Sequence, residues 1–437
     1  MPSRSPSPSS YEIRGPETRR ELMALADLYG KAFGQYQRLY DLFLDKHFHQ
    51  MPREQWRLSR AMWTPDGSPV ALVRICDRTM RLGAAMLRVA GIGDVCTHPT
   101  LRKRGLLRML FTHVNRFLRD EGYDLSLLFG IPDFYDKFGY VTGVSNGTLQ
   151  LPRRQAARLS GPYTGRHIRR ADARAIARLF RDDLAIRDGA MARWGDAWLK
   201  LAVREKLCRV LADAKGRLRA YYRARTDGDA LVLTEVSLGR KPDQPGVLSV
   251  LADMAKVARA CEKPSLRFEL DPAHPIGRFC VADGCEVRWW IGHRGGAMAR
   301  ITHLENLCHH MAPEWERLLA ARWHRLPACA GQRRATGKMP VPPEWSGRLR
   351  LKTDIGAVDL AITRGKVEVV GRASLPREPA PAAIAADQDK LCRLVLGFHS
   401  PAAAVFLGEA RITAAARPLA DALFPARSLV FFPYDRF

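Results

Sequence analysis

The stretch from Val95 to Leu118 combines residues suited to binding a negatively charged group. An apolar segment ends at Thr97, and three cations and a glycine follow in the turn Arg102-Lys103-Arg104-Gly105. The first N–H groups of a helix have no internal partner, and the helix dipole favours negative charge beside them. A helix is predicted directly after the turn, because apolar residues recur with the helical period at Leu106, Leu107, Leu110, Phe111, Val114, Phe117 and Leu118. The segment therefore predicts an anion site between a strand and a helix, where Gly105 lets a ligand approach the backbone closely.

Residues 11–150 are predicted to form the α/β unit that positions this turn. Two helices are expected within residues 17–46. Strands are expected at Val70–Cys76, Met80–Val89, Ala90–Thr97 and Leu125–Phe129. A strand, a helix and a following strand connected in this way form a parallel pair. The strand that ends at Thr97 and the strand at Leu125–Phe129 should therefore lie side by side. The bend at His98-Pro99 predicts that this pairing loosens at Thr97.

Residues 151–294 repeat a similar order of elements. A helix ending near Leu184, two strands at Leu218–Arg225 and Ala230–Ser237, a helix at Leu248–Ala260 and a strand at Ser265–Leu270 are predicted. The loop 238–246 lacks the basic turn with its glycine, and its two prolines remove N–H donors. The second unit is therefore predicted to bind no such anion.

Residues 295–437 are predicted to form a third unit. Strands are expected at Leu349–Lys352, Val358–Ile362 and Lys366–Val370, an Ala/Pro-rich linker at Pro379–Ala386, and a helix at Lys390–Gly397. The Pro/Ser-rich residues 1–10 are predicted to be a disordered tail.

Three segments resemble one family. The pattern V-x-T-x-P-x-x-R-x-x-G-x-x-x-x-L, from Val95 to Leu110, resembles the acetyl-CoA-binding segment of the GNAT N-acetyltransferase superfamily. Leu107 stands where a small residue is usual, a departure shared by the Eis-like branch. Phe134 to Tyr140 resembles that branch's Y-x-R-F-G-Y, with Lys137 in place of the arginine. The chain ends at Phe437, and the branch also ends in phenylalanine.

This resemblance implies an α/β (α+β) fold class with tandem GNAT-type mixed-sheet domains and a sterol-carrier-like α/β domain. Residues 11–150 would be the catalytic domain, 151–294 a degenerate second GNAT-like domain and 295–437 the sterol-carrier-like domain. Tyr135 would be the general acid and the carboxylate of Phe437 the base, with His98 as the alternative base. Tyr140 would be structural. The residues expected to bind acetyl-CoA are Val95, Cys96, Thr97, Arg102, Lys103, Arg104, Gly105, Leu106, Leu107 and Arg108.

The implied activity is acetyl-CoA-dependent N-acetyltransfer to a primary amine by direct transfer, within a homo-oligomer. The acceptor could be an aminoglycoside-like polyamine, a small amine or a protein lysine. A polycationic acceptor would need a locally acidic pocket, which Asp94, Asp133, Asp136 and Asp435 could supply. Two alternatives stay open, a non-catalytic CoA-binding scaffold and a lipid carrier that uses the C-terminal domain.

Composition sets the remaining bounds. The 437 residues are 46% hydrophobic, which suffices for two or three domain cores. The formal charge of +25 is spread along the chain without a nucleic-acid motif, so no specific nucleic-acid partner is expected. The cysteines form no C-x-x-C pair, and no metal site is expected. No segment has the length of a membrane span or the pattern of a signal peptide, and a cytoplasmic protein is expected.

Overall fold

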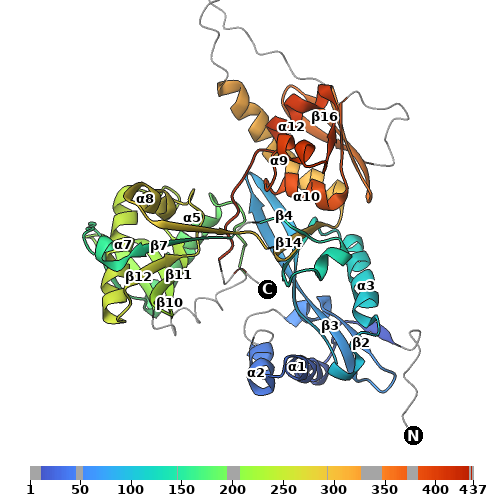
Figure 1. Cartoon of the computed structure of the whole chain (residues 1–437), viewed down its shortest axis with the longest axis horizontal. Helices are drawn as coiled ribbons and strands as arrows, with labels where there is room; N and C mark the ends of the chain where they lie inside the picture. Colours follow the sequence, from blue (N-terminus) through green and yellow to red (C-terminus); the bar gives the residue numbers. More distant parts are fainter. Residues whose placement is uncertain are drawn as a thin grey trace, which may run out of the picture.

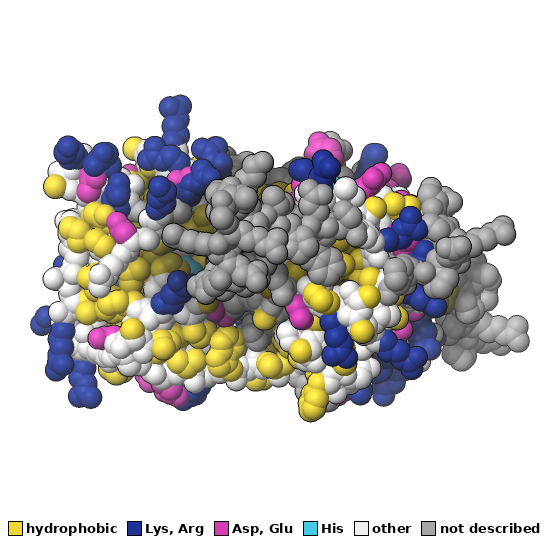
Figure 2. Space-filling model, turned by 90° about the horizontal axis from the view of Figure 1, so that it is seen from above, with side chains coloured by type: hydrophobic (Ala, Val, Ile, Leu, Met, Phe, Trp, Pro, Cys, Tyr) yellow, Lys and Arg dark blue, Asp and Glu magenta, His cyan; other side chains and the backbone are white. Residues whose placement is uncertain are grey.

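The computed structural model describes residues 11–45, 53–144, 146–193, 207–292, 294–325, 347–371, 382–432 and 435. These residues form three units, each built around one sheet (Figure 1). No helix in these ranges has the length and apolar character needed to cross a membrane. Basic side chains are scattered over the face seen in Figure 2 and do not gather in one tract.

The first sheet has the order β1-β2-β3-β4-β5-β14-β6. Its strands are β1 (Glu12–Arg14), β2 (Arg60–Trp63), β3 (Pro69–Leu82), β4 (Ala85–Thr97), β5 (Leu125–Gly130), β14 (Gly296–Ile301) and β6 (Val141–Thr142). Helix α3 (Leu106–Asp120) connects β4 to β5, which pair in parallel as predicted. Val73 and Ile75 pack in one cluster with α3, whereas Leu72 packs with α1 (Arg19–Phe33). Because successive strand residues point to opposite faces, α3 and α1 cover opposite faces of the sheet. Helix α2 (Tyr36–Asp45) packs beside α1.

The hairpin of β3 and β4 corrects the predicted strands. The sequence suggested separate strands at 70–76, 80–89 and 90–97, but the chain forms two long strands that turn at Gly83-Ala84. Gly83 has a φ of +62°, and a Cβ there would collide with the carboxylate of Glu314. The Gly83 N–H donates to Asp188 over 2.6 Å and the Ala84 N–H to Glu314 over 2.7 Å. The turn is therefore fixed by acidic residues of the other two units, which a local pattern does not reveal.

The second sheet repeats the plan of the first, with the order β13-β7-β12-β11-β10-β9-β8. Helix α7 (Gln244–Ala260) connects the parallel strands β11 and β12, as α3 connects β4 and β5. The predicted α/β class with two similarly built mixed sheets is confirmed. The other helices of this unit are α4 (Arg153–Ala156), α5 (Ala173–Leu184) and α8 (Pro275–Asp283). Its strands are β7 (Asn146–Pro152), β8 (Thr164–His167), β9 (Cys208–Ala212), β10 (Leu218–Asp227), β11 (Ala230–Ser237), β12 (Ser265–Phe268) and β13 (Glu286–Trp290).

The two sheets exchange strands. β7 begins within residues 11–150 yet pairs with β12 and β13 of the second sheet. β14 lies within residues 295–437 yet pairs with β5 and β6 of the first sheet. The predicted boundaries at 150 and 294 therefore cut across the sheets. Sequence order could not show this, because both pairings join strands far apart in the chain.

The third unit is a five-stranded sheet of order β17-β16-β15-β18-β19, covered by helices. Strand β18 (Ala382–Ala385) pairs in parallel with β15, so the predicted linker at 379–386 contains a strand. Alanine is a weak strand former, and this pairing is non-local. The other strands are β15 (Gly347–Thr353), β16 (Gly356–Thr363), β17 (Lys366–Val370) and β19 (Arg411–Ile412). The helices are α9 (Leu304–Arg325), α10 (Gln388–Val395), α11 (Pro401–Phe406) and α12 (Arg417–Leu423).

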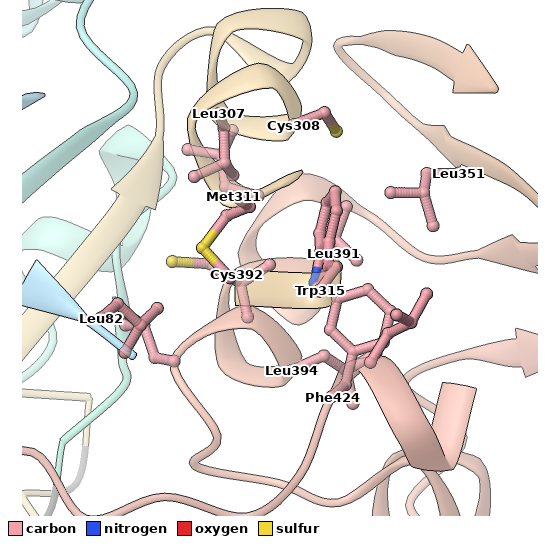
Figure 3. Packing of buried hydrophobic residues seen from close by; sticks show 14 of the residues in the cluster. Leu82, Leu307, Cys308, Met311, Trp315, Leu351, Leu391, Cys392, Leu394 and Phe424 are labelled. Atoms are coloured by element: carbon pink, nitrogen blue, oxygen red, sulfur yellow. The ribbon is translucent and has the colours of Figure 1, made fainter. Parts of the chain in front are cut away.

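The core of the third unit is continuous with the first sheet. Leu82 of β3 lies in the same buried cluster as Met311 of α9 and Cys392 of α10 (Figure 3). The rings of Trp315 and Phe424 meet edge to face at 5.9 Å. Side chains thus fill the space between the third sheet and its helices, and this unit braces the end of the β3–β4 hairpin. Its likeness to a sterol-carrier domain stays a prediction.

Candidate active site

The parallel strands β4 and β5 part before they end. Their last paired residues are Ile92 and Leu128, although β4 continues to Thr97 and β5 to Gly130. The sequence predicted that pairing would loosen at Thr97. The opening begins five residues earlier, at Ile92. It leaves backbone groups of both strands without a partner strand between them.

A β-bulge at Asp94 causes this early parting. The register of β3 against β4 shifts between Leu72 and Arg74, and Asp94 has a φ of +47°. The Arg74 guanidinium donates through Nε to the Asp94 carboxylate over 2.5 Å, with both side chains buried. Tyr29 of α1 also hydrogen-bonds Asp94, and burial together with that carboxylate raises the pKa of the Tyr29 hydroxyl. Bulges commonly terminate pairing beside active sites, and this one is held by a buried ion pair.

The basic turn has the geometry of an anion site. Lys103 and Gly105 have φ values of +63° and +78°, so the backbone curls before α3 begins. Gly105 is the N-cap residue of α3, and no side chain caps the free N–H groups that follow. Lys103, Arg104 and Arg108 are exposed beside them. These groups fit a pyrophosphate, because oriented N–H groups, the helix dipole and nearby cations all favour negative charge.

The other residues expected at the cofactor contribute differently. The Arg102 guanidinium donates to the carbonyl of Ala32 at the end of α1, so it ties the turn to α1. Cys96 is buried in the cluster beside α1, whereas Val95 packs on the α3 side. The Cys96 side chain therefore cannot face a ligand in the opening, and its backbone is what it can offer. Leu106 is buried, and Thr97 and Leu107 are half-buried.

Replacing Gly105 by valine should raise the KM for acetyl-CoA at least about tenfold. A β-branched residue is strained by roughly 1–2 kcal/mol at this φ, and its side chain would stand where the phosphates approach. No protein atom lies within 4 Å of a Cβ built at Gly105, so the core should be unaffected. Gly216→Val is the matched control, because Gly216 has a φ of +74° and equally open surroundings. Equal KM values in the two variants, from initial rates at varied acetyl-CoA, would contradict the assignment of the turn.

Tyr135 lies at the β5 side of the opening. It begins the short 3₁₀ turn Tyr135–Phe138 and packs edge to face on Phe111 of α3 at 5.9 Å. A Cβ on Gly130, the last residue of β5, would come within 2.7 Å of the Tyr135 ring. Burial raises the pKa of Tyr135 to about 12. None of the described residues hydrogen-bonds the Tyr135 hydroxyl, so this proton is held and is available to a ligand.

The remaining predicted residues differ in their surroundings. Tyr140 is buried, and its hydroxyl lies 2.7 Å from that of Ser126, in keeping with a structural role. His98 follows β4, and its Nδ1 lies 2.9 Å from the hydroxyl of Thr100. Phe437 lies outside the described residues. The chain before it is described to Phe432 and again at Asp435, which is buried.

The second unit has a matching helix that is closed to anions. Asp243 is the N-cap of α7, and its carboxylate accepts from the Gly246 N–H over 2.8 Å. A negative side chain thus occupies the position that is uncapped at α3. Strand β11 also has a register shift, beside Thr234, and the buried Glu235 follows it. Glu235 pairs with Arg193 at 2.8 Å, so ionised side chains fill the end of β11.

Comparison with known proteins agrees with the geometry. Residues 16–143 match the family model described as an acetyltransferase (GNAT) domain. This part of the chain is therefore a GNAT acetyltransferase domain, and it contains the parted strands, the basic turn and Tyr135. No curated protein matches the chain.

Solved structures share the architecture over nearly the whole chain. A GCN5-related N-acetyltransferase from Anabaena variabilis superposes with a TM-score of 0.70 at 13% identity, covering 96% of this chain and 98% of that one. A probable N-acyltransferase from Enterococcus faecalis gives 0.70 at 16%, covering 97% and 99%. Eis1 from Mycobacterium abscessus gives 0.59 at 15%, covering 96% and 98%. At these identities the likeness establishes the fold and leaves the acceptor open.

Proposed function

We propose that the chain is an acetyl-CoA-dependent N-acetyltransferase that acts on a primary amine by direct transfer. The supporting observation is that three features converge on the first sheet. These are the parted ends of β4 and β5, the uncapped N-terminus of α3 and the free hydroxyl of Tyr135. The turn from Lys103 to Arg108 would hold the CoA phosphates, and the thioester would lie between the parted strands.

The residues divide the chemistry between them. The backbone at the Asp94 bulge would orient the thioester carbonyl, since its groups have no partner on β5. As the amine nitrogen bonds to that carbonyl carbon and the carbon–sulfur bond breaks, Tyr135 would give its proton to the leaving sulfur. A pKa near 12 keeps the hydroxyl protonated until a strongly basic thiolate forms.

The proton lost by the amine needs an acceptor, for which we propose the carboxylate of Phe437. This assignment rests on the family resemblance. Support comes from the tail before it, which runs from the third unit between the other two (Figure 1). Phe431 contacts Phe129 of β5 with ring centroids 6.2 Å apart, and Phe432 is buried against the second unit. Asp435 is fixed by Arg193 at 2.9 Å.

The test is release of free CoA from acetyl-CoA in the presence of primary amines, using the full chain. Turnover that depends on the amine, with an N-acetylated product seen by mass spectrometry, is the expected result. Tight acetyl-CoA binding without turnover on any amine would favour the scaffold alternative. Stabilisation by fatty acids or sterols but not by acetyl-CoA would favour the lipid carrier.

Acetyl-CoA should bind with a stoichiometry of one per chain. The second unit offers an anion the Asp243 carboxylate in place of free N–H groups. Isothermal titration of the full chain with CoA should give one site, and Gly105→Val should weaken it. Two equivalent sites would contradict the proposed division between the units. The homo-oligomer implied by the resemblance stays a prediction.

A further inference from the structure

The face of the first sheet opposite α3 carries a polar strip between two apolar clusters. On β3, Leu72 belongs to the cluster beside α1 and Met80 to the core shared with the third unit. Between them, Arg74, Cys76 and Arg78 share this face because strand residues alternate. We call these three residues, with Gly91 and Gly93 opposite them on β4, the central strip. The two glycines leave this part of the face without side chains from β4.

The central strip lies where an acceptor would approach. Gly93 is the first β4 residue beyond the last pair with β5, so the strip reaches the opening. In the proposed reaction the α3 N-terminus holds the phosphates, and the donor arm enters from the α3 side. The attacking amine must then come from the opposite face. This inference therefore rests on the proposed function.

The second unit supplies further charges beside the strip. Its segment before Arg193 docks on the free edge of β3, where Met80 and Met191 form an antiparallel bridge. The Ala192 N–H donates to the carbonyl of Thr79 over 2.8 Å. Arg193 consequently follows next to Arg78, and it binds Asp435 of the tail.

Arginine neutralises each acidic residue that could have attracted a polycation. Asp94 pairs with Arg74 at 2.5 Å and Asp435 with Arg193 at 2.9 Å. Asp133 and Asp136 lie 3.6 Å and 3.8 Å from Arg294. Among the described residues of the strip and the ion cluster beside it, five guanidinium groups face four carboxylates: Arg74, Arg78, Arg187, Arg193 and Arg223 against Asp94, Asp183, Glu235 and Asp435.

Two groups in the strip remain suited to an anion. Arg74 Nη2 is buried, and the described residues give it no hydrogen-bond partner. Arg78 keeps a half-buried side chain at the edge of the strip. Burial lowers the pKa of Arg78, and the nearby Asp435 only partly offsets this effect, as Arg74 and Arg193 oppose it. A further negative charge would stabilise this arrangement.

We propose that the acceptor carries an anionic group beside its reactive amine, and that Arg78 binds this group as a specificity-determining residue. A guanidinium pairs with a carboxylate or a phosphate in the same forked geometry, so both anions belong to the class. Polycationic amines are disfavoured, because they would bring further positive charge to a region where arginine already outnumbers the acids.

The first test compares primary amines that differ only at the far end. The probes are 4-aminobutanoate, 4-aminobutanamide and 1,4-diaminobutane, with 3-aminopropylphosphonate as the phosphate-like arm. We expect kcat/KM, from CoA release, to be at least about tenfold higher for either anion than for the amide, and lowest for the diamine. A flat series or the reverse order would overturn this inference and leave the transferase function standing. No CoA release with any amine would contradict the proposed function itself.

The second test assigns the preference to Arg78. Arg78→Gln should abolish the advantage of 4-aminobutanoate by raising its KM about tenfold, while the values for the amide stay near wild type. Arg78→Lys should restore part of the preference, because it keeps the charge but not the fork. Arg225→Gln, an exposed arginine of β10, is the matched control and should change neither acceptor. An equal loss for the anionic and the neutral acceptor would assign Arg78 a structural role and overturn the proposal.

Discussion

Tyr135→Phe should lower kcat by about 10²- to 10⁴-fold and leave the affinity for acetyl-CoA nearly unchanged. Loss of a positioned general acid removes an interaction that forms only in the transition state. The ring would keep its packing on Phe111 and Gly130, because phenylalanine lacks only the hydroxyl. Pre-steady-state measurement of CoA release, with acetyl-CoA binding measured separately by titration, distinguishes chemistry from binding.

Tyr140→Phe is the matched control for this experiment. Tyr140 belongs to the same aromatic cluster, 6.4 Å from Tyr135 between ring centroids, and its hydroxyl is engaged by Ser126. Its loss should cost about 1 kcal/mol of stability and little turnover. Wild-type turnover in Tyr135→Phe, or equal losses in the two variants, would remove Tyr135 from the mechanism. Because burial raises the pKa of Tyr135 to about 12, its ionisation should not limit the rate between pH 7 and 9.

Much of the first unit could be predicted from local pattern. The helical period of the residues after Gly105 predicted α3, and the strand, helix and strand order predicted the parallel pair. The exchange of β7 and β14 between the sheets could not be predicted, since each pairing partner lies more than one hundred residues away. The turn at Gly83 was missed for the same reason, because its hydrogen-bond partners lie in other units.

The candidate site was predicted unevenly. The basic turn and Tyr135 came from spacing and resemblance, whereas the Asp94–Arg74 pair that holds the bulge did not. Asp94 was interpreted as a possible source of acidity, and only the fold shows that a buried arginine neutralises it. Asp243 could have been found, because an aspartate three residues before a glycine at the start of a helical pattern is a helix-capping signal.

The buried ion cluster at the tail leads to the second large prediction. Asp435→Asn should lower the free energy of unfolding by about 3–5 kcal/mol, because it removes one partner of a buried pair. The Asp435 side chain is fully buried, 2.9 Å from Arg193 and 3.9 Å from Arg187. Asparagine keeps the shape and leaves both guanidinium groups with less compensating charge. Urea unfolding followed by tryptophan fluorescence measures the change.

The same variant tests whether the tail serves the reaction. Asp435 lies two residues before Phe437, the proposed base, so a displaced tail should lower kcat even where the protein stays folded. Asp120→Asn is the control, because the Asp120 carboxylate is 59% exposed beside Arg119 and such pairs contribute little. Both stability and kcat should stay at wild-type values in that control. A stability loss in Asp435→Asn with full turnover would separate the tail from catalysis and favour His98 or a water molecule as the proton acceptor. Unchanged stability would show that the ion pairs at Asp435 do not hold the tail.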